Sequence, residues 1–441
     1  MQLAKIKRVI EENNLFNVEN LLSFLNNNWG ELPKEVLKEI AEFANANRQT
    51  NSAYYTDDFI VNKIIDGLPE VNRDTIYVLE PSAGIGNFVY PFILKFAKKY
   101  NHIYLTLNDI DPDSLKIAKF FLSKEKIPDN ITISYSSYDF LDGLAFYDKK
   151  YDYVIGNPPF KRISNKQAAI LGDEYTLNLA GQFLLKAADI SSVTALVMPK
   201  NFLSTGEFEH TRKVIKNIPI NKIIDFGEKG FKGVLIETIG IIFGYKNNGE
   251  TEIESLVDDT DRKVRQSYIT SDIYPSWLLY RNSFFDEISA SMEFNVFNVF
   301  RDRQLTNNKM QDSGEVRVIK SRNIAQDGSG IIDIRGYDKY ISYETLNTLV
   351  VKKYLTNHDI YLVPNMTYYP RMIRKKNNYV MNGSVAILEL KDGKTINNKE
   401  MSFFATDIFR KFYGIARNKG SRSLNIDKRS VFWFGIYKGN K

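Results

Sequence analysis

Apolar residues recur with the period of a helix near the start of the chain. The segments LFNVENLLSFL and LPKEVLKEIAEFANA each carry an apolar stripe, and in the second it is formed by Val36, Leu37, Ile40 and Ala44. Pro33 stands where the first turn of a helix tolerates proline. The pattern predicts short amphipathic helices that together form a helical arm over residues 1–47.

Between residues 48 and 250 strand-like runs alternate with helix-like ones. The strand-like runs are TIYVLEP, IYLTLND, ITISYSSYDF, YDYVIGNPP, VTALVMP, NKIIDFG and TIGIIFGY. The helix-like runs include FVYPFILKFAKKY, PDSLKIAKFFLSKEK and AGQFLLKAADI. Such alternation predicts an α/β domain built on a mainly parallel sheet.

After residue 250 the alternation disappears. Short aromatic and β-branched runs such as EVRVIK, YLVPNMTYY and SVFWFGIY are separated by turn signals that include Asp-Gly and Asn-Gly. This pattern predicts a second, mixed and β-rich domain over residues 260–441. The acidic stretch LVDDTDRK, residues 256–263, is interpreted as the linker.

Composition places the chain among ordinary globular proteins. Of its 441 residues 43% are hydrophobic and 25% are charged. No apolar run approaches the roughly 20 residues of a membrane helix, and the segment MQLAKIKRVIEENN turns polar where a signal peptide has its apolar core. The simplest expectation is a cytoplasmic protein without a membrane partner.

The chain contains no cysteine and only three histidines, His102, His210 and His358. The lack of cysteine excludes disulfides, thiolate metal sites and a cysteine nucleophile. No two histidines have ligand spacing, so no metal is expected, and each histidine is more simply a surface or packing residue.

Charge divides the chain into two parts. Residues 261–441 hold 30 Lys and Arg against 18 Asp and Glu, a net charge of +12, whereas the first 260 residues carry −6. A basic, aromatic-rich domain is typical of phosphate binding, and a merely solvated basic surface is the alternative.

Glycines follow the first strand of the α/β domain. Gly84 and Gly86 stand in a strand-to-helix turn, where the backbone can approach a ligand and the helix start offers free N–H groups. The third glycine of the dinucleotide fingerprint is replaced by Val89. A ligand smaller than a nicotinamide dinucleotide, with a charged amino-acid end, fits this turn better.

Acids stand at the ends of the next two strands. Asp109 lies about 25 residues past the glycines, where an acid binds the hydroxyls of a ribose, while Asp111 fits better as the cap of the following helix. Asp139 and Phe140 end the third strand and offer an acceptor and a ring to a nucleoside base. The dipeptide indicates a nucleoside site only because it stands at the carboxyl end of a strand of the predicted sheet.

The fourth strand ends in Asn157-Pro158-Pro159-Phe160. Two prolines can simply stop a strand. The Asn157 side-chain oxygen and the Pro158 carbonyl can also accept hydrogen bonds from both N–H groups of an aromatic amine and draw its lone pair out of conjugation. Phe160 can stack on the ring. Such a site needs no general base, metal or covalent intermediate.

Together, residues 80–88 (EPSAGIGNF) and 157–160 (NPPF) resemble the signature motifs of S-adenosylmethionine-dependent N6-adenine DNA methyltransferases of restriction-modification systems, in the order of their gamma group. The resemblance implies a Rossmann-like domain with a seven-stranded sheet and methyl transfer to an adenine rotated out of the duplex. It implies catalytic roles for Asn157, Pro158, Pro159, Phe160 and Phe231. It implies cofactor contacts by Tyr55, Thr56, Glu80, Pro81, Ala83, Gly84, Gly86, Asp109, Ile110, Asp139, Phe140 and Asn157. Asp57 replaces the proline that the family usually has after Thr56, which weakens the match there.

The C-terminal domain is then interpreted as a target-recognition domain on double-stranded DNA. Residues 318–324 (VIKSRNI) and 424–428 (LNIDK) loosely resemble elements of such domains. Candidate DNA contacts are Arg322, Arg371, Arg374, Lys375, Lys376, Arg422 and Lys428. No nuclease motif is present, so a cognate restriction endonuclease is expected as a separate protein, and the oligomeric state is left open with a monomer as the simplest form.

Several alternatives remain at this stage. Related enzymes with similar motifs methylate cytosine N4, RNA or protein glutamine, although a basic C-terminal domain favours DNA. A DNA-binding subunit with an inactive methyltransferase fold conflicts with the intact Asn157 and Gly84, and an oxidoreductase conflicts with the missing third glycine. Methylation of cytosine C5 is excluded because the chain has no cysteine.

Overall fold

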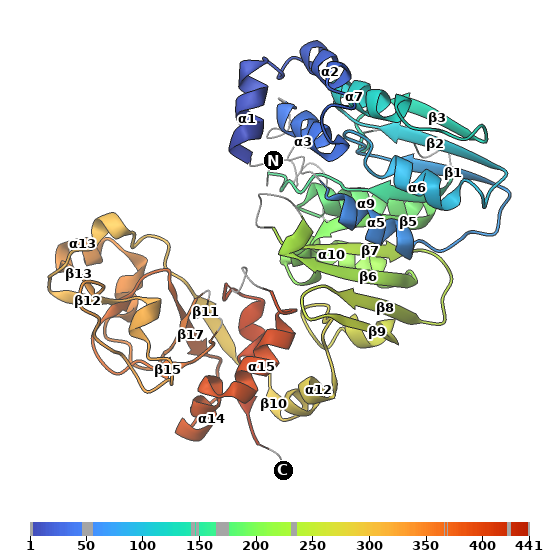
Figure 1. Cartoon of the computed structure of the whole chain (residues 1–441). Helices are drawn as coiled ribbons and strands as arrows, with labels where there is room; N and C mark the ends of the chain where they lie inside the picture. Colours follow the sequence, from blue (N-terminus) through green and yellow to red (C-terminus); the bar gives the residue numbers. More distant parts are fainter. Residues whose placement is uncertain are drawn as a thin grey trace. The chain divides into compact units, whose positions relative to one another are not determined.

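The computed structural model describes residues 3–45, 56–142, 146, 150–164, 176–230, 236–365, 367, 369–420 and 425–439. The chain divides into two compact units, Met1–Thr270 and Ser271–Lys441 (Figure 1). The boundary falls beyond the acidic stretch that the sequence suggests as a linker.

A nine-stranded sheet forms the centre of the N-terminal unit, with strand order β3-β2-β1-β4-β5-β7-β6-β8-β9. The strands are β1 Thr75–Glu80, β2 His102–Asn108, β3 Ile131–Ser136, β4 Tyr151–Gly156, β5 Ser191–Pro199, β6 Ile220–Gly227, β7 Thr238–Phe243, β8 Glu250–Ser255 and β9 Thr260–Arg265. Strands β1 to β5 pair in parallel, and β7 runs antiparallel to both β5 and β6. The carboxyl ends of β1, β2, β3 and β4 therefore share one edge of the sheet, which confirms the α/β prediction.

The prediction of seven strands and of a linker at residues 256–263 is wrong. Strand β8 pairs in parallel with β6, and β9 returns beside it as a hairpin. In β9 exposed and partly buried positions alternate, as expected at a sheet edge that faces water. The acidic residues that suggest a linker occupy this hairpin and its turn, where Asp259 has a φ of +55°.

Helices precede and cover the sheet. They are α1 Leu3–Glu12, α2 Val18–Asn27, α3 Lys34–Ala44, α5 Asp58–Gly67, α6 Val89–Phe96, α7 Pro112–Ser123, α9 Leu179–Ile190, α10 Glu209–Ile215 and α11 Gln266–Ile269. The first three form the predicted helical arm: α2 begins after Asn17, whose side chain accepts from Glu19 N and Asn20 N, and α3 begins after Pro33.

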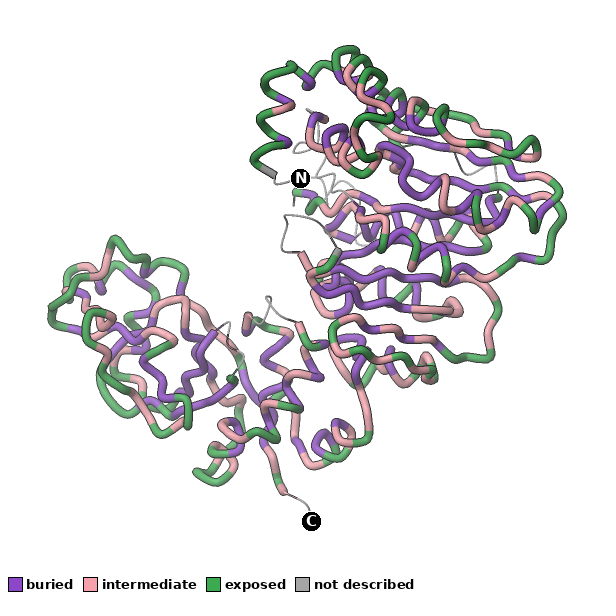
Figure 2. The backbone as a smooth tube through the Cα atoms, viewed as in Figure 1, coloured by how far each residue is buried: buried purple, intermediate pink, exposed green. Residues whose placement is uncertain are grey.

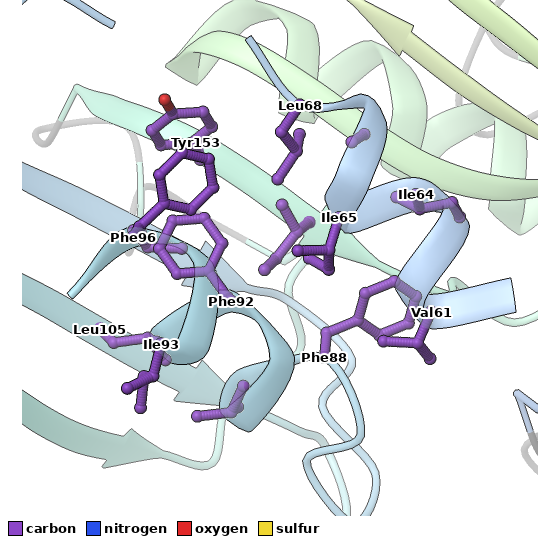
Figure 3. Packing of buried hydrophobic residues seen from close by; sticks show 14 of the residues in the cluster. Val61, Ile64, Ile65, Leu68, Phe88, Phe92, Ile93, Phe96, Leu105 and Tyr153 are labelled. Carbon is purple, nitrogen blue, oxygen red and sulfur yellow. The ribbon is translucent and has the colours of Figure 1, made fainter. Parts of the chain in front are cut away.

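One hydrophobic cluster joins α5 and α6 to the sheet (Figure 3). Ile64 and Ile65 from α5 and Phe92 and Phe96 from α6 belong to it, and the Phe92 ring lies edge-on to that of Tyr153 in β4 with 5.4 Å between centres. Strands β4 and β7 are buried at every position. Buried residues predominate in the central strands of this unit (Figure 2). Strands covered on both faces read as continuous apolar runs, which is why these segments were recognisable in the sequence.

The C-terminal unit is mixed, with small sheets and short helices. Its sheets have the orders β10-β18, β11-β17-β14-β15 and β13-β12-β16. Its strands are β10 Met292–Glu293, β11 Phe297–Phe300, β12 Val316–Ile319, β13 Lys339–Ile341, β14 Tyr361–Pro364, β15 Ile373–Arg374, β16 Val380–Met381, β17 Val385–Leu390 and β18 Ile436–Tyr437. Its α-helices are α12 Ser283–Ala290, α13 Tyr343–Asn347, α14 Asn398–Ser402 and α15 Asp407–Ala416.

Candidate functional site

A cavity of about 290 Å³ lies at the carboxyl edge of the large sheet. Its wall includes the residues that follow β1, β2, β3 and β4. Among the predicted cofactor residues it is lined by Thr56, Glu80, Pro81, Ala83, Gly84, Asp109, Ile110, Asp139, Phe140 and Asn157. This volume is near the lower end for small-molecule sites, and the position is the usual one for ligands of an open α/β sheet.

The glycine turn after β1 has the backbone conformation that the sequence suggests. Gly84 and Gly86 have φ values of +53° and +80°, which side chains rarely adopt. Ala83 N donates to Asn108 O at 2.8 Å, and Gly84 N donates to Asp109 Oδ2 at 2.7 Å. The turn is thus bound to the end of β2, although Gly86 itself lines a smaller neighbouring cavity.

Glu80, the last residue of β1, is a buried acid with an unsatisfied oxygen. Its side chain is only 2% exposed, and Oε2 has no hydrogen-bond partner. Burial raises the pKa of this carboxyl well above its ordinary value, the Asp109 carboxyl raises it further, and the Phe88 N–H lowers it in part. A buried, unpaired acceptor on a cavity wall is costly unless a ligand supplies a donor.

Asp109 and Asp111 were the two candidates for a ribose-binding acid and for the cap of the next helix, and they make different contacts. Asp109 Oδ1 accepts from Asp111 N at 2.9 Å, and burial is the main reason that the pKa of the Asp109 carboxyl is raised. Asp111 caps α7, because its side chain accepts from Asp113 N. The helix-cap interpretation of Asp111 is confirmed, although Asp111 also lines the cavity beside Asp109.

The end of β3 is supported from behind by α9. Asp139 is exposed on the cavity wall, and Phe140 is buried among the rings of Phe146 and Phe183. Lys186 Nζ donates to Phe140 O at 2.5 Å and lies 5.0 Å from the centre of the Phe140 ring. Burial lowers the pKa of this lysine.

The Asn157-Pro158-Pro159 segment follows β4 directly and lines the same cavity. Asn157 Nδ2 donates to Thr56 Oγ1 at 2.9 Å, and Ser82 Oγ donates to Asn157 O at 3.1 Å. Both ends of Asn157 are therefore held by segments that also line the cavity. Phe160 is partly buried against the core cluster and is not among the residues lining the cavity.

Two of the predicted site residues in this unit, Tyr55 and Phe231, lie outside the described residues. Within the described parts of the chain no group of three or more His, Asp or Glu side chains is arranged to hold a metal ion. The same parts contain no helix both long and apolar enough to cross a bilayer.

Residues 95–231 match the model of the family described as Eco57I restriction-modification methylase. The resemblance to restriction-modification methyltransferases is confirmed. Residues 95–231, which we call the methylase segment, include the carboxyl ends of β2, β3 and β4 and also Asn157. No curated protein matches the chain.

Solved structures resemble the chain at low sequence identity. The modification subunit of a putative type I restriction enzyme from Vibrio vulnificus is 14% identical with a TM-score of 0.42, over 54% of this chain and 52% of that one. A putative class I S-adenosylmethionine-dependent methyltransferase from Listeria monocytogenes is 16% identical with a TM-score of 0.41, over 54% and 73%. The Type IIL restriction-modification enzyme MmeI, solved with DNA, is 14% identical with a TM-score of 0.49, over 98% and 67%. The match spans about half the length of the Vibrio subunit.

Two residues of the methylase segment that sequence reasoning missed hold the site together. Asn108 is fully buried; its Nδ2 donates to Pro81 O and Tyr138 O, and its Oδ1 accepts from Tyr138 N. It thereby joins the ends of β1, β2 and β3. Lys186 is the other; it stands within the apolar run AGQFLLKAADI, whereas Asn108 is the last residue of β2 and directly precedes Asp109.

In the C-terminal unit the structure corrects two of the candidate DNA contacts. Arg371 is 6% exposed and donates to Ile324 O and Tyr369 O. Lys375 is 0% exposed, donates to Leu355 O at 2.7 Å, and burial lowers its pKa to about 8. Both cations satisfy backbone carbonyls inside the unit and do not reach its surface.

The other basic candidates remain on the surface. Arg322, Arg374, Lys376 and Lys428 are exposed, and Arg422 lies outside the described residues. Arg322 follows β12 on a 3₁₀ turn whose Asn323 side chain accepts from Lys320 N and donates to Asp338 Oδ1 at 2.6 Å. The VIKSRNI motif therefore fixes a turn that presents Arg322, whose guanidinium lies 4.9 Å from the centre of the Tyr337 ring.

Proposed function

We propose that this protein transfers the methyl group of S-adenosylmethionine to the N6 amine of an adenine in double-stranded DNA, as the modification enzyme of a restriction-modification system. One observation carries the proposal. The Asn157-Pro158-Pro159 segment lines the same cavity as the glycine turn, Glu80 and Asp109. The group proposed to hold an aromatic amine and the groups proposed to hold a nucleoside thus line one cavity.

The cavity wall fits a cationic nucleoside. Among the described residues it is lined by the carboxyl groups of Glu42, Glu80, Asp109, Asp111 and Asp139 and by one ammonium group, that of Lys161. Glu80 Oε2 is a buried acceptor without a protein donor, and the glycine turn brings backbone close to the cavity. S-Adenosylmethionine supplies a methyl group bound to a positively charged sulfur, together with hydroxyl and ammonium donors that such a wall can accept.

Asn157 and Pro158 would activate the amine. Their oxygen atoms would accept hydrogen bonds from its two N–H groups, so that the nitrogen lone pair leaves conjugation with the ring. An amine held in this way could take the methyl group that a bound S-adenosylmethionine would supply, with the sulfur keeping the electrons of the broken carbon–sulfur bond and an amine proton passing to water. An adenine inside a duplex cannot reach this edge of the sheet, so the base must be rotated out, with Phe160 and Phe231 as the rings proposed to hold it.

The C-terminal unit would position the protein on DNA. Arg322, Arg374, Lys376 and Lys428 are exposed cations suited to phosphate contacts, which orient a protein without reading sequence. Arg371 and Lys375 are not part of this proposed surface. A restriction endonuclease that recognises the same site would be the functional partner.

The product of the reaction tests this proposal. Purified protein is incubated with isotope-labelled S-adenosylmethionine and unmethylated DNA, RNA or protein, and the labelled product is identified by mass spectrometry. We expect N6-methyladenine in double-stranded DNA. Label in N4-methylcytosine, RNA or glutamine would show that the corresponding alternative is the substrate. The absence of label with every substrate would contradict methyltransferase activity.

Two adjacent lysines offer a matched test of DNA binding. Replacing the exposed Lys376 with methionine should weaken DNA binding and lower the slope of log affinity against log salt by about 1, because one phosphate contact is lost. Replacing the buried Lys375 with methionine removes the bond to Leu355 O and should lower the melting temperature while leaving the salt slope unchanged. Salt-dependent fluorescence anisotropy and thermal melts of both variants decide the assignment, which the opposite pattern would refute.

A further inference from the structure

The last helix of the arm, α3, forms part of the cavity wall. Glu42 lies in its final turn and Asn45 directly follows it, and both line the cavity with the ends of the strands. Both are half-buried. The arm therefore contributes polar groups to the site from a part of the chain that precedes every recognised motif.

Apolar packing fixes the arm to the glycine turn. Ile85 stands between Gly84 and Gly86, is 5% exposed, and belongs to a cluster with Leu37, Ile40 and Ala41 of α3. Ile117 and Phe121 of α7 belong to the same cluster. The arm and the turn thus share one core, and displacing the arm would uncover the turn.

Polar contacts connect the arm to Asn87, directly after the glycine turn, and to the start of α7. Asn45 Nδ2 donates to Asp111 Oδ2 at 3.0 Å and to Ser114 Oγ at 2.9 Å. Glu42 Oε1 accepts from Asn87 Nδ2 at 3.2 Å. Asn87 is 8% exposed, it lines the cavity, and its Oδ1 has no hydrogen-bond partner.

Glu42 and Asn87 thus place a carboxylate and an unsatisfied amide oxygen side by side on one wall. Both are acceptors. Glu42 already accepts from Asn87, whereas the Asn87 oxygen is a buried acceptor without a donor, and a ligand donor can recover the free energy that this costs. A ligand that bonds to both residues must carry donors such as hydroxyl or ammonium groups. A negative wall charge favours a cation over a neutral ligand.

We infer that Glu42 is a cofactor-binding residue, that its carboxylate and Asn87 Oδ1 accept hydrogen bonds from bound S-adenosylmethionine, and that Asn45 is a positioning residue that holds Asp111 and Ser114. This inference rests on the proposed function. It makes the arm a component of the cofactor site. Arm docking and cofactor binding then stabilise each other, because the contact between Glu42 and the ligand forms only when the arm is docked.

The test compares two glutamates of the same helix. Glu42→Gln keeps the size of the side chain and removes its charge, and its dissociation constant for S-adenosylmethionine should rise about tenfold, as expected for the loss of one charge-assisted hydrogen bond. Glu35→Gln, at an exposed position of α3, should bind like the wild type. Isothermal titration calorimetry measures both, with thermal melts to verify folding.

A second measurement uses the unmodified protein. Saturating S-adenosylmethionine should slow amide hydrogen exchange over residues 34–44, because binding stabilises the docked arm and so raises the free energy of its local opening. An unchanged dissociation constant for Glu42→Gln, or exchange over α3 that the cofactor does not slow, overturns the inference while leaving the proposed function intact. A wild-type protein that binds no S-adenosylmethionine would instead refute the proposed function, and the inference with it.

Discussion

Replacing Asn157 with alanine is expected to lower the rate of methyl transfer by about a thousandfold, the usual effect of removing one group that stabilises developing charge in a transition state. Asn157 follows a fully buried strand and is held through Thr56 and Ser82, so its amide is fixed before substrate arrives. The dissociation constant for S-adenosylmethionine should stay nearly unchanged, because Glu80, Asp109 and the glycine turn are intact. Single-turnover kinetics and calorimetry separate the two quantities.

Thr56→Val provides the control for this experiment. It removes the hydroxyl that accepts from Asn157 Nδ2 but leaves the amide in place. Its loss in rate should be about tenfold or less, since one neutral hydrogen bond contributes about 1 kcal/mol. Near-normal turnover of Asn157→Ala, or equal losses in the two variants, would contradict a direct role for the amide oxygen.

Replacing Glu80 with glutamine should stabilise the cofactor-free protein and weaken cofactor binding at the same time. The carboxyl is buried, has an unsatisfied oxygen and lies near Asp109, so its charge opposes folding. Removing it should raise the free energy of unfolding by about 1–3 kcal/mol. The same change removes a charged acceptor from the site and should raise the dissociation constant for S-adenosylmethionine by about 10- to 100-fold.

The stabilisation has a defined pH dependence. The pKa of the Glu80 carboxyl is higher in the folded protein than in the unfolded chain, so the folded state keeps this proton to higher pH. Stability from this group is present below the unfolded pKa and is lost as pH rises through the folded pKa. The advantage of Glu80→Gln should grow across that window, and cofactor affinity of the wild type should rise with pH as the carboxyl ionises.

Thermal melts and calorimetry at several pH values, with the exposed Glu31→Gln as control, measure both effects. A Glu80→Gln variant less stable than the wild type at every pH would mean that the carboxyl is satisfied in the folded state. Unchanged cofactor affinity would remove Glu80 from the binding site.

Strand ends were the part of the site that the sequence could predict. Buried strands read as apolar runs, and in an α/β domain their carboxyl ends meet at one edge, so the sequence places Asp109, Asp139 and Asn157 together, as the cavity does. Glu80 was implied only by the family resemblance. The cap at Asp111 follows equally from local rules, because a helix beginning at Pro112 needs an acceptor just before it.

What the sequence could not predict depends on partners distant along the chain. The run YYPRMIRKKNN shows its cations, but not that the carbonyls of Ile324 and Leu355 lie beside Arg371 and Lys375. The contact of Asn45 with Asp111 joins residues 66 positions apart, so no local pattern reveals that the arm reaches the cavity. In β9 the alternation of an edge strand was concealed by a composition typical of linkers.

The most direct test of the account is to express the chain in a host that lacks DNA methylation and to sequence the genome by a method that detects modified bases. We expect N6-methyladenine confined to one short sequence motif, and its complete loss with Asn157→Ala. A genome without modified bases, in cells whose purified protein binds S-adenosylmethionine, would contradict DNA as the substrate of the chain acting alone.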